Sequence, residues 1–189
     1  MRVIAGQYRS RPLRSQRGLA IRPTSDRLRE TLFNVLAGGD PGGLADTVWL
    51  DLYAGTGAVG IEALSRGAHM VYFVEEAAPA AALVRQNLLS LAVESDRFEV
   101  VEREVLAGLR RLDAQGVACD FCFLDPPYRL RSAYAETLGL LSQSRLLTPA
   151  GVAIAEHDRK FDPPAQVGAL QRYRKLEQGD AGLSFYRKQ

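Results

Sequence analysis

Short apolar runs that alternate with stretches of helical periodicity constrain the fold of this 189-residue chain more than any other feature. The runs predict strands at residues 47–52, 70–75, 97–102, 119–124 and 150–156, and the stretches between them predict helices at about 58–66, 79–92, 105–113 and 132–143. Strands separated by helices imply right-handed crossovers and a parallel sheet. We therefore expect an α/β domain.

The two ends of the chain depart from this alternation. Residues 171–177 and 183–187 flank Gly179-Asp180-Ala181-Gly182, which predicts an antiparallel β-hairpin that closes the sheet. The expected sheet thus has seven strands, most of them parallel. A glycine-rich break at 38–43 separates a basic N-terminal arm and helix (1–43) from a Rossmann-like domain (44–189).

Charge is concentrated in the first 29 residues. They hold eight arginines and a single acid, a net charge of +7, whereas the remaining residues carry 16 basic and 21 acidic side chains, or −5. A basic arm on an acidic body suggests a polyanionic partner. The irregular first 22 residues suit a small hairpin or an extended arm. Pro23-Thr24-Ser25-Asp26 then predicts a helix start.

The composition also excludes several classes of protein. No apolar run approaches the roughly 18 residues that a membrane span needs, and the N-terminus has no long apolar segment typical of a secretion signal, so a cytoplasmic protein without a membrane partner is expected. Cys119 and Cys122 have a CxxC spacing, but in a strand residues i and i+3 point to opposite faces, so their sulfurs should not converge. They are interpreted as core residues, and no metal site is expected.

A glycine-rich turn follows the first predicted strand of the domain. Gly55-Thr56-Gly57-Ala58-Val59-Gly60 matches G-x-G-x-x-G, a pattern that also describes NAD-binding proteins. Glu75, at the end of the next strand, could accept hydrogen bonds from both hydroxyls of a ribose. The turn therefore predicts a site for a nucleoside cofactor.

Two details favour S-adenosylmethionine over NAD. Asp51 ends the first strand and precedes Gly55 by four residues, whereas the strand of a dinucleotide fold usually leads directly into the first glycine. A carboxylate at position 51 can pair with the ammonium of a methionine moiety. Asp125-Pro126-Pro127-Tyr128 then supplies a site for a methyl acceptor. After the third strand, Glu104 is the expected partner of the adenine amino group.

The Asp-Pro-Pro-Tyr stretch emerges at the C-terminal end of a predicted buried strand, where open α/β sheets place their ligands. An aromatic amino group is a poor nucleophile, because its lone pair is delocalised. The Asp125 carboxylate and the Pro126 carbonyl can bond its two N–H groups and turn the lone pair toward a sulfonium methyl, and Tyr128 can stack on the planar target. These residues predict methyl transfer to an amino nitrogen.

With these residues assembled, nearly the whole chain resembles the ribosomal small subunit methyltransferase D family. The similar stretches include residues 2–13, 22–34, 51–57, 62–68 and 125–128, of which the first two are the most specific. The resemblance implies a Rossmann-like class I S-adenosylmethionine-dependent methyltransferase that modifies N2 of one guanine in 16S ribosomal RNA within the assembling small subunit. It implies a monomer in which Tyr53 and Thr56 join the cofactor site.

The resemblance also implies that the arginines of the arm and of the first helix grip RNA phosphates, namely Arg9, Arg11, Arg14, Arg27 and Arg29. Two other functions remain open. One is a methyltransferase for another amino group, such as adenine N6 in DNA or RNA or a protein glutamine. The other is a non-catalytic ribosome assembly factor.

Overall fold

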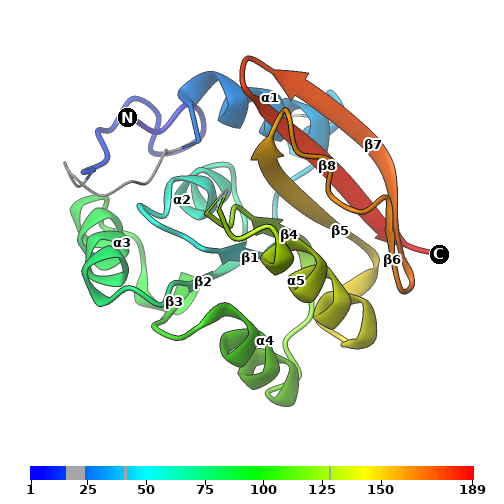
Figure 1. The fold of residues 1–189 in the computed structure, drawn as a ribbon. Coiled ribbons are helices and arrows are strands. Elements are labelled where there is room, and N and C mark those ends of the chain that lie inside the picture. The colour runs from blue at the N-terminus through cyan, green and yellow to red at the C-terminus, as the bar shows by residue number, and fades with distance from the viewer. Residues whose placement is uncertain (16–23, 41, 128) are drawn as a thin grey trace.

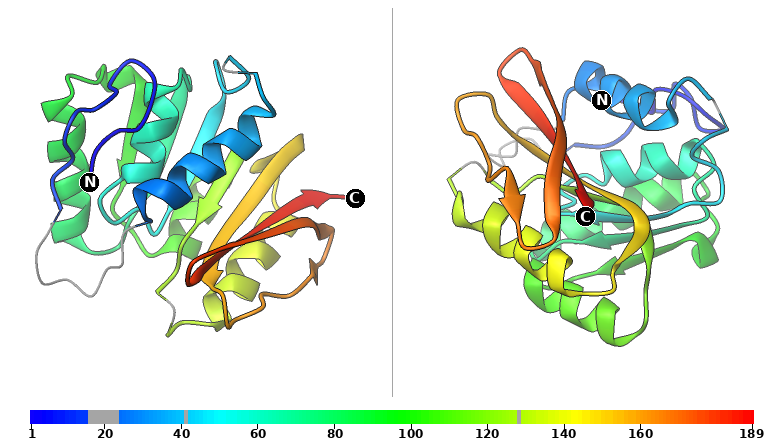
Figure 2. Two further views of the ribbon diagram at one scale, coloured as in Figure 1. Left: turned by 90° about the horizontal axis from the view of Figure 1, so that it is seen from above. Right: turned by 90° about the vertical axis from the view of Figure 1, so that its right-hand side faces the viewer.

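The computed structural model describes residues 1–15, 24–40, 42–127 and 129–189. A single sheet forms the centre of the molecule, and helices lie on both of its faces (Figure 1, Figure 2). In chain order the elements are α1 (Asp26–Ala37), β1 (Val48–Leu52), α2 (Ala58–Ser65), β2 (Met70–Val74), α3 (Ala78–Ser90), a 3-10 turn η1 (Ser95–Arg97), β3 (Phe98–Val101), α4 (Val105–Ala114), β4 (Cys119–Leu124), α5 (Ser132–Gln143), β5 (Leu147–Asp158), β6 (Gln166–Val167), β7 (Leu170–Gln178) and β8 (Ala181–Lys188).

The strands lie in the order β3-β2-β1-β4-β5-β8-β7-β6. The first five are parallel, and β8, β7 and β6 are antiparallel to their neighbours. The expected α/β architecture with an antiparallel C-terminal hairpin is therefore confirmed, but the expected number of strands is wrong: the described residues form eight. The additional strand, β6, has only two residues and pairs with the start of β7, so it leaves no alternating pattern in the sequence.

The sheet has a separate apolar core on each face. One core joins β1, β2 and β4 to side chains of α1, α2 and α3, and the other joins the same sheet to α4 and α5. Trp49 of β1 is fully buried in the first core, and its ring lies 5.2 Å from that of Phe33 in α1 and 4.6 Å from that of Phe121 in β4. Helix α1 is thus packed on the sheet and shares the core of the α/β domain.

The predicted helices of the α/β domain agree with the observed ones to within two residues at each end. The expectation for the two cysteines was half right. Both are buried and free, but both belong to the core on the α4 and α5 face. The pairing of β4 with β5 shifts register between Cys119 and Phe121, where β4 advances by two residues and β5 advances from Leu147 to Val152, so the extra residues lie in β5.

The first residues form a compact hairpin. Val3 N–H donates to Arg11 O at 3.0 Å, Ser10 N–H donates to Val3 O at 2.9 Å, and Leu13 N–H donates to Met1 O at 3.1 Å. Val3 and Leu13 are buried in the core shared with α1, α2 and α3. We refer to residues 1–15 as the N-terminal arm, and this arm is packed on the domain.

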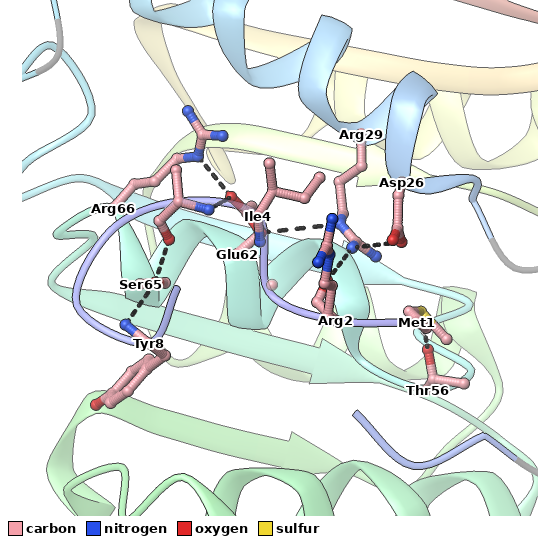
Figure 3. A network of polar contacts seen from close by, with 12 residues as sticks. Met1, Arg2, Ile4, Tyr8, Asp26, Arg29, Thr56, Glu62, Ser65 and Arg66 are labelled. Carbon is pink, nitrogen blue, oxygen red and sulfur yellow. Dashed lines mark hydrogen bonds and ion pairs between the residues drawn. The ribbon is translucent and has the colours of Figure 1, made fainter. Parts of the chain in front are cut away.

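A buried carboxylate on α2 holds the arm in place (Figure 3). The two oxygens of Glu62 accept the N–H groups of Ile4 at 2.8 Å and Ala5 at 3.0 Å, and one of them also accepts Arg66 Nε at 2.8 Å. Arg29 Nε lies 3.9 Å from the same carboxylate. Glu62 therefore ties the arm, α1 and α2 together.

No helix in the described part of the chain is long and apolar enough to cross a membrane.

Replacing Glu62 with Ala should lower the free energy of unfolding by about 3–5 kcal/mol, because the buried Arg29 loses a charge partner and two arm N–H groups lose their acceptor. Urea unfolding followed by circular dichroism measures this. Glu102→Ala is the control, because that exposed carboxylate pairs with Arg85 at 3.0 Å and its loss should cost less than about 1 kcal/mol. Equal effects of the two substitutions would contradict the assignment.

Candidate active site

The predicted site residues emerge together at one edge of the sheet. Leu52 at the end of β1 is in register with Val74 of β2 and with Leu124 of β4. Beyond these ends, Ala54 N–H donates to Val74 O at 3.2 Å and Asp125 N–H donates to Leu52 O at 3.5 Å. The glycine turn and the Asp-Pro-Pro stretch therefore follow adjacent strands, as the sequence predicted.

The glycine turn contains positive φ angles, which residues other than glycine adopt only with strain. Gly55 and Gly57 have φ angles of 56° and 75°, in the left-handed region, and Gly57 caps the start of α2. At Gly60, a Cβ atom would overlap the ring of Phe73 in β2, so glycine is needed for the close approach of α2 to the sheet. Each of the three glycines of the motif thus has a physical reason.

Asp51 lies beneath this turn. Its carboxylate accepts the N–H of Gly60 at 2.8 Å, and only 2% of the residue is exposed. Burial raises the pKa of Asp51 to about 7; the Gly60 hydrogen bond opposes this shift, and the nearby charge of Glu75 adds to it. Asp51 therefore supports the turn directly, and its pairing with a cofactor ammonium stays a prediction.

Tyr53 and Thr56 point to different neighbours. Tyr53, at φ 58°, brings its hydroxyl within 3.2 Å of Thr137 Oγ1 on α5, on the face opposite α2. Thr56 is buried, its Oγ1 lies 3.8 Å from Met1 Sδ, and its carbonyl accepts Asn87 Nδ2 at 3.0 Å. Thr56 is therefore in contact with the N-terminal arm as well as with α3.

The two carboxylates predicted to hold the nucleoside each bind backbone. Glu75 accepts the N–H groups of Gly55 and Ala77, both at 2.9 Å. Glu104 caps α4 by accepting the N–H groups of Leu106 and Ala107, also at 2.9 Å. A carboxylate has about four acceptor sites, so these bonds leave capacity for ribose or adenine contacts, which stay predictions.

The residues predicted to hold the methyl acceptor follow β4. Asp125 is half-buried and Pro126 is buried, whereas Pro127 is exposed and its carbonyl accepts Leu130 N–H at 2.7 Å, which closes the turn. Tyr128 lies outside the described residues.

Sequence reasoning missed one buried carboxylate at this edge. Glu156 follows Ala155 of β5, which is in register with Leu124 of β4, so Glu156 lies beside the Asp125 position. It is 3% exposed and accepts the hydroxyl of Thr24 at 2.6 Å. Because Thr24 and Glu156 are 132 residues apart, only the folded chain reveals that the start of α1 is attached next to Asp125.

The predicted RNA-contacting arginines divide into two groups. Arg9, Arg11, Arg14 and Arg27 are exposed, although Arg11 also donates to Ser90 O at 2.9 Å. Arg29 is wrong as an RNA contact, because it is 0% exposed and its guanidinium is paired with Asp26 at 3.0 Å. Burial lowers the pKa of Arg29, and Glu62 and Asp26 oppose that shift, as expected of a structural ion pair.

A second set of basic side chains, also missed from the sequence, flanks Asp125. Arg129 and Arg131 follow the Asp-Pro-Pro stretch, and Arg159 and Lys160 follow β5; all four are exposed. The guanidinium of Arg131 lies 5.3 Å from the ring centre of Phe161, which brings the two loops together. We name these four residues the basic rim.

Comparison with known proteins places this arrangement in context. The family model described as Conserved hypothetical protein 95 matches residues 1–187. The chain is 35% identical to the Bacillus subtilis protein YlbH, with 100% of this chain and 99% of that protein covered. It is 33% identical to the ribosomal RNA small subunit methyltransferase D of Haemophilus influenzae, with 99% and 92% covered.

Solved structures show the same fold. The Escherichia coli protein yhhF has a TM-score of 0.84 at 29% identity, with 100% of this chain and 98% of that chain covered. A more distant structure, SMU.776, is 14% identical with a TM-score of 0.63, covers 85% of this chain and 48% of its own, and was solved with S-adenosylhomocysteine. The likeness to the second structure concerns the fold alone.

The contribution of Asp51 to the stability of the protein should fall as pH rises from about 4 to 7. In this range Asp51 keeps its proton in the folded state but has lost it in the unfolded chain, so the folded state binds more protons. A pKa difference of about three units corresponds to roughly 4 kcal/mol. Urea unfolding across this range should show a smaller pH dependence for Asp51→Asn, which keeps an acceptor for Gly60. An unchanged pH dependence in that variant would contradict the burial argument.

Proposed function

Because the chain belongs to the Conserved hypothetical protein 95 family and to the ribosomal RNA small subunit methyltransferase D family, we propose that it methylates the N2 amino group of a guanine in 16S ribosomal RNA. S-adenosylmethionine is the methyl donor. The observation that carries the proposal is the hydrogen bond from Asp125 N–H to Leu52 O. This bond holds the residues that are proposed to bind the methyl acceptor next to the end of β1, from which the glycine turn begins.

The residues around the turn fit the donor. Gly55 and Gly57 allow close approach of a ligand to the backbone, and Glu75 lies at the end of β2 to accept the ribose hydroxyls. Asp51, half protonated near neutral pH, gains a partner for its charged form when an ammonium is bound beside it. When bound, the cofactor supplies the activated methyl group.

The residues after β4 orient the acceptor. The Asp125 carboxylate accepts one N–H of the guanine amino group and the Pro126 carbonyl accepts the other, so that the nitrogen lone pair faces the methyl carbon. Proline at 126 and 127 fixes φ and leaves no backbone N–H to compete for these acceptors. Positioning of this kind can offset roughly 7–11 kcal/mol of a barrier, and no separate strong base is needed, because the nitrogen becomes acidic once methylated.

The substrate is expected to reach this edge between two basic surfaces. Arg27 lies at the start of α1, near the bond between Thr24 and Glu156, and the basic rim lies on the side of β4 and β5; Arg9 follows Tyr8 of the arm, which is bonded to Ser65 at the end of α2. Phosphate contacts on both sides fix the register of the RNA while the target base leaves its stack, at a cost of a few kcal/mol.

The small subunit is the expected particle, and mass mapping of 16S ribosomal RNA from cells lacking the protein tests the target. Loss of a methyl group from adenine instead would favour the alternative amino-group reaction.

Asp125→Ala should reduce methyl transfer to small subunits from the deletion strain by about 100-fold or more, because the amino group loses one of the two acceptors that aim it. Transfer of tritiated methyl groups measures the rate, and calorimetry with S-adenosylhomocysteine measures cofactor binding, which should change little. Full transfer by the variant would refute the mechanism. Binding of particles without any transfer by the wild-type protein would favour an assembly factor.

Arg9→Ala and Arg27→Ala should each weaken binding to small subunits and reduce the slope of log affinity against log salt by about 0.7, because one phosphate contact is lost. Arg131→Ala in the basic rim should have the same effect. Arg172→Ala is the control, since its guanidinium is held by Asp162 at 2.8 Å on the hairpin. Equal slopes for all four variants and the wild type would exclude these contacts.

A further inference from the structure

One buried side chain connects the N-terminal arm to the glycine turn. Asn87 of α3 is fully buried, and its Oδ1 accepts the N–H of Arg14 at 2.8 Å. Its Nδ2 donates to the carbonyl of Arg14 at 3.2 Å and to the carbonyl of Thr56 at 3.0 Å. A single amide thus holds the backbone of the arm through both its oxygen and its nitrogen, and the backbone of the turn through its nitrogen.

The arm and the turn also meet at a second point. Met1 Sδ lies 3.8 Å from Thr56 Oγ1, and Figure 3 shows this contact at one end of the network that holds the arm. Along α2, Glu62 accepts Ile4 and Ala5 N–H, and Ser65 Oγ accepts Tyr8 N–H at 3.0 Å. The arm is therefore attached both to the turn and to the helix that the turn begins.

We propose that Asn87 is a positioning residue that couples the arm to the turn, so that cofactor binding at Gly55–Gly57 and RNA binding by the arm strengthen each other. The proposal rests on the proposed function, which takes this turn as the cofactor site. Asn87 is fully buried, and it acts through the peptide of Thr56.

The physical basis is the permissive backbone of the turn. Thr56 stands between two glycines in the left-handed region, and glycine loses more conformational freedom on ordering than any other residue. A ligand that fixes the Thr56 peptide also fixes the carbonyl to which Asn87 donates. The Asn87 side chain then loses less conformational freedom when it holds Arg14. Linkage then requires the reverse effect: RNA that is bound to the arm raises the affinity of the turn for its ligand.

Asn87 differs from the other residues that hold the arm. Glu62 and Ser65 fix residues 4–8 to α2 but make no side-chain bond to residues 55–57 in the described part of the chain. The guanidinium of Arg14 donates to Gln86 Oε1 at 3.4 Å. The Arg14 residue is exposed to solvent, where an RNA phosphate can reach it. The bond network therefore leads from the cofactor turn to an arginine predicted to contact RNA.

Hydrogen exchange of the full-length protein, with and without saturating S-adenosylhomocysteine, tests the coupling. In the wild type, the ligand should slow exchange of the Arg14 amide at least about fivefold more than exchange of the Leu183 amide in β8, which reports overall stabilisation. Asn87→Ala should still bind the ligand but lose this extra slowing. Ser184→Ala is the matched control, because it removes a buried bond to His157 Nε2 of 3.0 Å far from the turn, and it should keep the slowing.

A second readout measures the reverse effect. The affinity of the wild-type protein for small subunits from the deletion strain should rise at least about fivefold with S-adenosylhomocysteine present, and Asn87→Ala should show no rise. Equal slowing of Arg14 and Leu183 in the wild type, or retained slowing in Asn87→Ala, would overturn the coupling. The wild-type comparison decides this even if the variant does not fold. Failure of the wild type to bind the ligand at all would instead overturn the proposed function.

Discussion

The site depends on the hydrogen bonding between parallel strands whose ends coincide. Because β1 lies between β2 and β4 in register, the residues that leave these strands enter the same space. Two backbone bonds, from Ala54 to Val74 and from Asp125 to Leu52, continue the pairing just beyond the strand ends. The glycine turn and the Asp-Pro-Pro stretch, 70 residues apart in the chain, are brought together by this backbone pairing.

Buried polar groups then attach the N-terminal arm to this framework. Glu62 and Asn87 are both fully buried, and each is bonded to backbone of the arm. A buried polar group costs free energy unless its partners are in place, so these side chains favour one position of the arm over others. The arrangement links the most basic part of the chain to helices that flank the candidate cofactor site.

Much of the fold follows from local patterns. The apolar runs at 47–52 and 119–124 predicted β1 and β4 closely, and the glycine motif predicted the turn between β1 and α2. Two expectations failed where a local rule met a long-range constraint. Cys119 and Cys122 belong to one core although strand alternation predicts opposite faces, and the packing of α1 buries Arg29, which the sequence analysis assigned to RNA phosphates.

By itself, the sequence determined most of the elements and the parallel sheet, and it indicated the edge and the residues that are proposed to bind the ligands, because these depend on periodicity, glycine conformation and strand order. Only the tertiary structure decided which polar groups become buried partners: Arg29 with Glu62, Thr24 with Glu156, and Asn87 with Arg14 and Thr56. The physical reason is that a buried hydrogen bond depends on the positions of two segments at once. The periodicity of one segment does not predict where the other segment will lie.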